Sequence, residues 1–231
     1  MQDIQFVFFD LDRTLWDFEA NSKATLEELF AEFGLAERLG VEAPQFIQEY
    51  KRINELFWTD YRNGVIKKEE LRYARFEAAL KFFGHHDQEM AADIGELYIS
   101  RSPRKTALVD GSIELLEYLK TKYELHIITN GFEEVQHIKM ESAGLAPYFG
   151  HVITSESAGA KKPNPVIYHH AAKLTGATAE NSIMIGDHYE ADVFGALEVG
   201  WKAVLYDPNK QKAQQTDFLH IHHLSELKTL L

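Results

Sequence analysis

Five short apolar runs alternate with longer amphipathic stretches along the chain. The runs lie at residues 4–9, 125–128, 152–154, 183–185 and 203–205. Short continuous apolar runs are typical of strands that are buried on both faces of a parallel sheet. The stretches between them favour the crossover helices that join parallel strands. The pattern therefore predicts an α/β fold with a doubly wound, mostly parallel sheet and a Rossmann-like core.

Three helices of this core can be read from their periodicity and their ends. They are expected at residues 113–122, 133–143 and 191–199. Ser112 is placed to cap the first, because a serine oxygen can accept hydrogen bonds from first-turn amides. Gly144 and Gly200 are expected to end the other two, since glycine readily adopts the left-handed conformation found beyond helix ends.

The long stretch from residue 16 to residue 102 has a different pattern. It contains no strand-like run, and its apolar positions recur at helical spacing in segments 19–33, 45–62, 68–83 and 87–100. Glycines at positions 34, 40, 64 and 84 mark the turns. We expect an inserted all-helical domain at 16–102 and an α/β core formed by 1–15 and 103–231.

Composition limits the classes of function. The chain has 231 residues, 45% of them apolar, and 24 basic against 36 acidic side chains give a formal net charge of −12. This balance disfavours binding to polymeric nucleic acid or an anionic membrane, but it allows a small phosphorylated ligand in a locally positive pocket. The absence of cysteine excludes disulfides and thiolate catalysis. Without a basic, apolar leader or a membrane-spanning run, a cytoplasmic location is expected.

The first apolar run ends in two carboxylates, Asp10 and Asp12. In extended backbone, residues i and i+2 point to the same side, so these like charges would lie close together. A cation must hold them, or one of them must carry a proton. Taken alone, the pair is better explained as an acidic turn after an edge strand, so the other motifs decide between the two interpretations.

Two other runs end in polar residues, Thr129 and Asp187. Because ligands of open parallel sheets bind beyond the carboxyl ends of the strands, Asp10, Thr129 and Asp187 could converge on one crevice. Thr129-Asn130-Gly131 offers hydrogen-bond donors to an anion, although Asn-Gly is also a common turn.

Asp187 and Asp192 supply two more carboxylates to this end of the sheet. With Asp10 they form a set of hard oxygen ligands suited to Mg²⁺. Asp192 alone would also be a favourable charge at a helix N-terminus. Lys162, in the proline-rich segment 160–165, could balance the acidic cluster, or it could be a solvated surface lysine.

These motifs together resemble the haloacid dehalogenase superfamily of phosphohydrolases. The resemblance covers the whole chain and rests on Asp10-x-Asp12-x-Thr14, Thr129-Asn130-Gly131, Lys162-Pro163 and Gly186-Asp187-x4-Asp192, in the order found in that superfamily. The helical insertion is similar to the superfamily's cap domain. Arg13 stands where many members carry glycine.

The resemblance implies a role for each motif residue. Asp10 would attack phosphorus and form an aspartyl-phosphate, while Asp12 would protonate the leaving group and then activate water. Thr129, with Asn130 or its backbone amide, would hold the phosphoryl group, and Lys162 would neutralise it. Mg²⁺ would bind Asp10, the backbone carbonyl of Asp12 and Asp187, supported by Asp192. Dehalogenases lack the second acid, so Asp12 favours phosphoryl chemistry.

The insertion also resembles the cap of bacterial pyrimidine 5'-nucleotidases. The similarity rests on segment 54–64 and on Arg75-Phe76, and Asn54, Trp58 and Tyr61 share one helix face. These side chains, with Arg75 and Phe132, are candidates for substrate contacts, and packing within the domain is the competing interpretation.

We therefore expect a Mg²⁺-dependent phosphomonoester hydrolase whose partner is a small phosphorylated metabolite, with a nucleoside 5'-monophosphate as the expected substrate. A sugar-phosphate phosphatase or a phosphomutase on the same core is the alternative within enzymes. A non-enzymatic module that accepts phosphate on aspartate is the alternative outside them.

Overall fold

A computed structural model describes residues 3–210 and 218–231. The chain divides into two compact units, one made of Met1–Phe18 with Thr106–Leu231 and the other of Glu19–Lys105. We call them the core unit and the helical unit. Each boundary falls three residues beyond the position expected from the sequence. None of the helices in the described ranges is long and apolar enough to cross a membrane.

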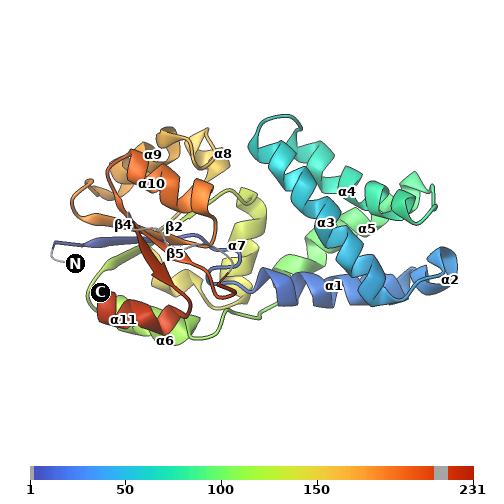
Figure 1. Ribbon diagram of the computed structural model, residues 1–231, viewed down its shortest axis with the longest axis horizontal. Helices are drawn as coiled ribbons and strands as arrows, with labels where there is room; N and C mark the ends of the chain where they lie inside the picture. The colour runs from blue at the N-terminus through green and yellow to red at the C-terminus, as the bar shows by residue number, and fades with distance from the viewer. Residues whose placement is uncertain (1–2, 211–217) are drawn as a thin grey trace. The chain divides into compact units, whose positions relative to one another are not determined.

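The core unit contains one six-stranded sheet in the order β3-β2-β1-β4-β5-β6, and every neighbouring pair is parallel (Figure 1). The order reverses beside the central strand β1, between β1 and β4. Such a reversal opens a crevice at the carboxyl ends of the strands. The strands are β1 (Phe6–Phe9), β2 (Glu124–Thr129), β3 (His151–Thr154), β4 (Ser182–Gly186), β5 (Lys202–Tyr206) and β6 (Leu219–Ile221).

Helices cover both faces of this sheet, as Figure 1 shows. Alternate residues of a strand point to opposite faces, so Phe6 and Phe8 pack with residues of α9 (Pro165–Thr175) and α10 (Gly195–Glu198). Val7 and Phe9 belong to the opposite layer, with α6 (Ser112–Leu119) and α11 (Leu227–Leu230). This arrangement confirms the predicted doubly wound α/β fold.

The remaining core helices connect these elements. They are α7 (Glu133–Ser142), the short α8 (Ser155–Ala158), and a π-helical segment at Tyr189–Phe194 that runs directly into α10. The π-helical segment and α10 together replace the single helix expected at 191–199. Gly144 and Gly200 follow α7 and α10 with φ angles of 69° and 79°, so both end their helices in the left-handed conformation.

The expected cap at Ser112 is wrong. Gly111, with a φ of 80°, occupies the position before α6, and the side chain of Ser112 makes no capping bond. Instead, the Ser112 hydroxyl donates to the backbone carbonyl of Leu15 at 3.1 Å. The serine is therefore used to attach α6 to the segment that follows β1.

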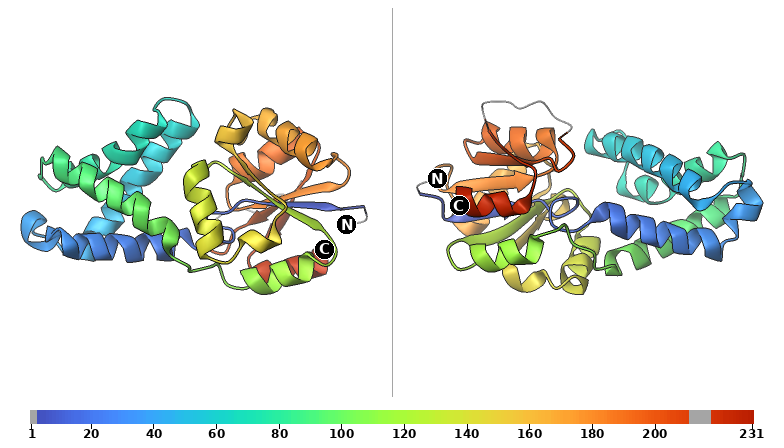
Figure 2. Two further views of the ribbon diagram at one scale, coloured as in Figure 1. Left: turned by 180° about the vertical axis from the view of Figure 1, so that it is seen from behind. Right: turned by 60° about the horizontal axis from the view of Figure 1, so that its bottom comes forward.

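The helical unit contains no strand, in agreement with the predicted all-helical insertion (Figure 2). Its core holds an aromatic cluster in which the Tyr50 and Phe76 rings lie 4.9 Å apart and the Phe76 and Tyr98 rings 5.3 Å apart. Its helices are α1 (Phe18–Glu32), α2 (Leu35–Leu39), α3 (Ala43–Arg62), α4 (Lys68–Phe82) and α5 (Gln88–Arg101).

Candidate active site

The segment after β1 is a tight turn that presents Asp10 and Asp12. The amide of Asp10 still donates to Ile185 of β4 at 2.9 Å, and the amide of Arg13 then donates back to Trp16 at 2.9 Å. Arg13 has a φ of 65°, in the left-handed region that a side chain rarely adopts. This conformation explains why glycine suits the position between Asp12 and Thr14.

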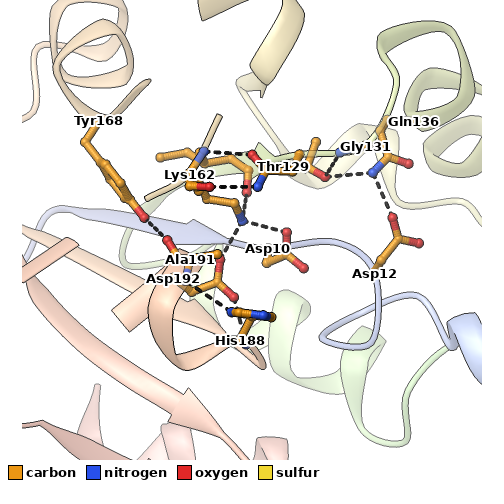
Figure 3. A network of polar contacts seen from close by, with 12 residues as sticks. Asp10, Asp12, Thr129, Gly131, Gln136, Lys162, Tyr168, His188, Ala191 and Asp192 are labelled. Atoms are coloured by element: carbon orange, nitrogen blue, oxygen red, sulfur yellow. Dashed lines mark hydrogen bonds and ion pairs between the residues drawn. The ribbon is translucent and has the colours of Figure 1, made fainter. Parts of the chain in front are cut away.

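Lys162 is the central cation of the site (Figure 3). Its Nζ donates to Asp10 Oδ1 at 2.7 Å, to Asp192 Oδ1 at 2.6 Å and to the carbonyl of Ile128 at 2.6 Å. Three acceptors match the three protons of an ammonium group, so the buried charge is fully hydrogen-bonded. Burial alone would lower the pKa of Lys162, but the charges of Asp10 and Asp192 raise it above its ordinary value.

Asn130 fixes the backbone that carries Lys162. Its amide nitrogen donates to the Lys162 carbonyl at 3.0 Å, and its oxygen accepts from the Lys162 amide at 2.8 Å. This reciprocal pair joins the end of β2 to the loop before α9. The side chain of Asn130 is thus engaged in positioning the lysine.

Three carboxylates meet beside Lys162. Oxygen atoms of Asp10, Asp187 and Asp192 all lie within 4.8 Å of one another. The second oxygen of Asp192 accepts from the amide of His188 at 3.0 Å. Gly186 leaves room for this arrangement, because a Cβ at that position would lie 2.3 Å from Asp192 Oδ2.

Two cations, Lys162 and Arg13, act on three buried or partly buried carboxylates and do not balance them. Burial raises the pKa of Asp10 to about 8, and the neighbouring Asp192 and Asp187 act in the same direction while Lys162 opposes them. Burial and Asp192 also raise the pKa of Asp187 to about 7. The cluster therefore has the charge and the hard oxygen donors that a divalent cation such as Mg²⁺ requires.

Asp12 belongs to a separate network. Its Oδ1 accepts from Lys139 Nζ at 2.6 Å and its Oδ2 from Gln136 Nε2 at 2.9 Å, as Figure 3 shows for the glutamine. The Gln136 amide also donates to Thr129 Oγ1 at 2.7 Å. The two carboxylates of the first motif are thus held by different cations, Lys162 for Asp10 and Lys139 for Asp12.

Gln136 and Lys139 are not among the site residues predicted from the sequence. Both lie on α7, and both are buried. Their spacing of three residues puts them on the same face of the helix, directly after the Thr129-Asn130-Gly131 motif. That spacing was the available signal, but polar residues on an amphipathic helix are normally assigned to the solvent face.

The candidate substrate residues differ in accessibility. In the helical unit, Asn54 and Arg75 are buried, and the Arg75 guanidinium donates a 2.7 Å hydrogen bond to the Asn54 side-chain oxygen. Tyr61 is also buried, and its ring packs edge-on against that of Trp58 with the ring centres 5.6 Å apart. Trp58 itself is only partly buried. In the core unit, Phe132 is buried directly before α7.

The family model for haloacid dehalogenase-like hydrolases matches residues 4–200 of this chain. The chain belongs to the haloacid dehalogenase-like hydrolases. This membership confirms the resemblance read from the four motifs, all of which lie inside the matched segment.

Several enzymes of known name are similar to this chain over most of its length. A pyrimidine 5'-nucleotidase of Streptococcus pneumoniae, PynA, is 31% identical over 92% of this chain and 89% of its own. A ribulose-1,5-bisphosphate 5-phosphatase of Halopiger xanaduensis is 32% identical over 89% and 85%. The crystal structure of the hydrolase YfnB from Bacillus subtilis, bound to magnesium, matches with a TM-score of 0.89, at 26% identity and 99% coverage of both chains.

Proposed function

We propose that this haloacid dehalogenase-like phosphatase is a Mg²⁺-dependent 5'-nucleotidase that acts through an aspartyl-phosphate on Asp10. The observation that carries the proposal is the separation of its two motif carboxylates. Asp10 lies with Asp187 and Asp192 in an acidic cluster that could hold a metal ion. The side chain of Asp12 lies outside that cluster and is hydrogen-bonded by Gln136 and Lys139. A nucleophile and a proton carrier require such different environments.

In the first half-reaction, an oxygen of Asp10 bonds to phosphorus and the bond from phosphorus to the leaving alkoxide breaks. Asp12 gives its proton to that alkoxide. In the second, Asp12 takes a proton from water, the water oxygen bonds to phosphorus, and the carboxylate of Asp10 is released with inorganic phosphate. Each step conserves charge and protons, because Asp12 regains in the second half-reaction the proton that it gave up in the first.

The remaining residues hold the phosphoryl group and the metal. The Thr129 hydroxyl and the backbone amide of Asn130 donate to phosphoryl oxygens, and the positive charge of Lys162, whose protons are held by Asp10, Asp192 and Ile128, neutralises the group. The carboxylates of Asp10 and Asp187 and the backbone carbonyl of Asp12 would hold Mg²⁺, which would neutralise developing negative charge when bound. Asp192 supports this set by its bond to Lys162.

Trp58 is the best candidate for recognition of the base. Of the five candidate substrate residues, it alone is only partly buried, and an indole ring can stack on a planar ligand. The similarity to PynA supports a pyrimidine nucleotide as substrate. The similarity to a ribulose-bisphosphate phosphatase favours a sugar phosphate as the second candidate.

A phosphate-release screen over nucleoside 5'-monophosphates and sugar phosphates tests the proposal. We expect release that requires Mg²⁺, is highest with pyrimidine nucleotides and is abolished in Asp10→Asn. Preference for sugar phosphates would replace the nucleotidase proposal with the second candidate. Transfer of phosphate to another sugar position would indicate a mutase, and a stable acyl phosphate without turnover would indicate a signalling module.

A further inference from the structure

The Asp12 carboxylate is bracketed by two side chains of α7. Lys139 Nζ contacts one oxygen at 2.6 Å and Gln136 Nε2 contacts the other at 2.9 Å. Donors on both oxygens fix the plane of the carboxylate as well as its position. Lys162 cannot also orient the Asp12 carboxylate, because its three protons are donated to Asp10, Asp192 and Ile128.

Two neighbours, Asp12 and Trp16, hold the ammonium group of Lys139 in place. Its side chain is 7% exposed, and its ammonium lies 4.4 Å from the centre of the buried Trp16 indole ring. A buried ammonium is costly unless it is paired, and here an anion and an aromatic face both stabilise it. The lysine therefore has little freedom to leave Asp12.

Gln136 connects Asp12 to the phosphoryl-binding motif. Its amide nitrogen donates to both Asp12 Oδ2 and Thr129 Oγ1, and a reversed amide would place its oxygen against the Asp12 carboxylate. Gly131 leaves space for this amide, since a Cβ there would lie 2.1 Å from Gln136 Nε2. The orientation of Gln136 is thus fixed by charge and by packing.

The same contact determines what Thr129 can do. Its oxygen accepts from Gln136 Nε2 at 2.7 Å and from the Gly131 amide at 3.0 Å. A hydroxyl has two acceptor sites and one proton, so both acceptor sites of Thr129 are used. Its proton can only be donated, which is the role that binding a phosphoryl oxygen requires.

We propose that Gln136 and Lys139 are positioning residues, which aim Asp12 at the leaving-group oxygen and orient the Thr129 hydroxyl as a donor. The inference rests on the proposed phosphatase function and deepens it. Because the two residues act through Asp12, their loss affects most strongly those substrates whose leaving group needs a proton.

The test compares Gln136→Met and Lys139→Met with Glu141→Gln, an exposed control on α7. A nucleoside 5'-monophosphate is the substrate with a poor leaving group, and p-nitrophenyl phosphate the one with a good leaving group. We expect kcat for the nucleotide to fall at least tenfold in both variants, with a smaller fall for p-nitrophenyl phosphate and little change in KM. Glu141→Gln should resemble the wild type.

A double-mutant cycle separates positioning from a structural role. In an Asp12→Asn background, Lys139→Met should cost little further activity, because the group that it positions is already disabled. Equal losses on both substrates, or additive losses in the cycle, would overturn the inference.

Lys139→Arg, which keeps the cation, should retain more activity than Lys139→Met. If Lys139→Met does not fold, Gln136→Met provides the same test. Absence of phosphate release by the wild type would overturn the proposed function itself.

Discussion

Lys162 Nζ and Asp10 Oδ1 form a 2.7 Å ion pair in which both residues are buried. Removing one partner of a buried pair leaves an uncompensated charge, which costs about 3–5 kcal/mol of stability. We predict that Lys162→Met lowers the free energy of unfolding by about this amount at pH 8 and abolishes turnover. Denaturant titration followed by fluorescence measures the first effect. A variant as stable as the wild type would show that Asp10 and Asp192 do not depend on this lysine.

Stability without metal should fall as the pH rises from 6.5 to 8. The pKa of Asp10 is raised from 3.8 to about 8, and that of Asp187 to about 7, so the folded state holds protons that the unfolded state has released. The free energy of unfolding therefore decreases with pH in this window. Thermal unfolding in EDTA should show the decrease, and Mg²⁺ should offset it most at pH 8. Asp10→Asn should flatten the profile, and a midpoint that rises with pH in EDTA would contradict the assignment.

His126 should make the fold sensitive to acid. It is buried in β2 between aromatic rings, and burial, with a smaller contribution from His151, lowers its pKa from 6.5 to about 4. The unfolded state binds a proton in this range and the folded state does not, so stability is lost as the pH falls from 6.5 towards 4, by up to about 3 kcal/mol.

The variant His126→Phe should remove most of this loss, because phenylalanine keeps an aromatic ring beside Phe8 and has no proton to bind. Urea unfolding at pH 4.5 and pH 6.5 measures the difference, with the exposed His137→Ala as control. An unchanged pH dependence in His126→Phe would assign the acid sensitivity to other groups.

Trp58 and Asn54 should respond differently to substitution. Trp58→Ala removes a partly exposed ring, so we predict that KM for the preferred nucleotide rises about fivefold to tenfold, the equivalent of about 1 to 1.4 kcal/mol of stacking. Its kcat on p-nitrophenyl phosphate should not change, and Leu56→Ala on the same helix provides an exposed control.

Asn54→Leu leaves the buried Arg75 without its hydrogen-bond partner and should lower the thermal midpoint instead. Steady-state kinetics and thermal unfolding distinguish the two effects. A raised KM with unchanged stability in Asn54→Leu would place Asn54 among the substrate contacts.

The sequence predicts those parts of the fold in which the apolar pattern is strong. Five strands appear as apolar runs, whereas β6 escapes detection because only Ile221 of its three residues is buried. Motif residues such as Asp10, Thr129 and Asp187 lie at strand ends or directly after them, where the topology brings them together. Gln136 and Lys139 cannot be found from the local pattern, because they are buried through hydrogen bonds to Asp12, which lies 124 and 127 residues away in the sequence.

The division into two units has an evolutionary consequence. Asp10, Asp12, Thr129, Lys162 and the other residues assigned to phosphoryl chemistry all lie in the core unit, and the helical unit of Glu19–Lys105 contributes none of them. Substitutions in the helical unit therefore leave every one of these proposed residues in place. Under the proposed role of Trp58, selection on the helical unit would change which metabolite is accepted while the residues proposed for hydrolysis are inherited unchanged.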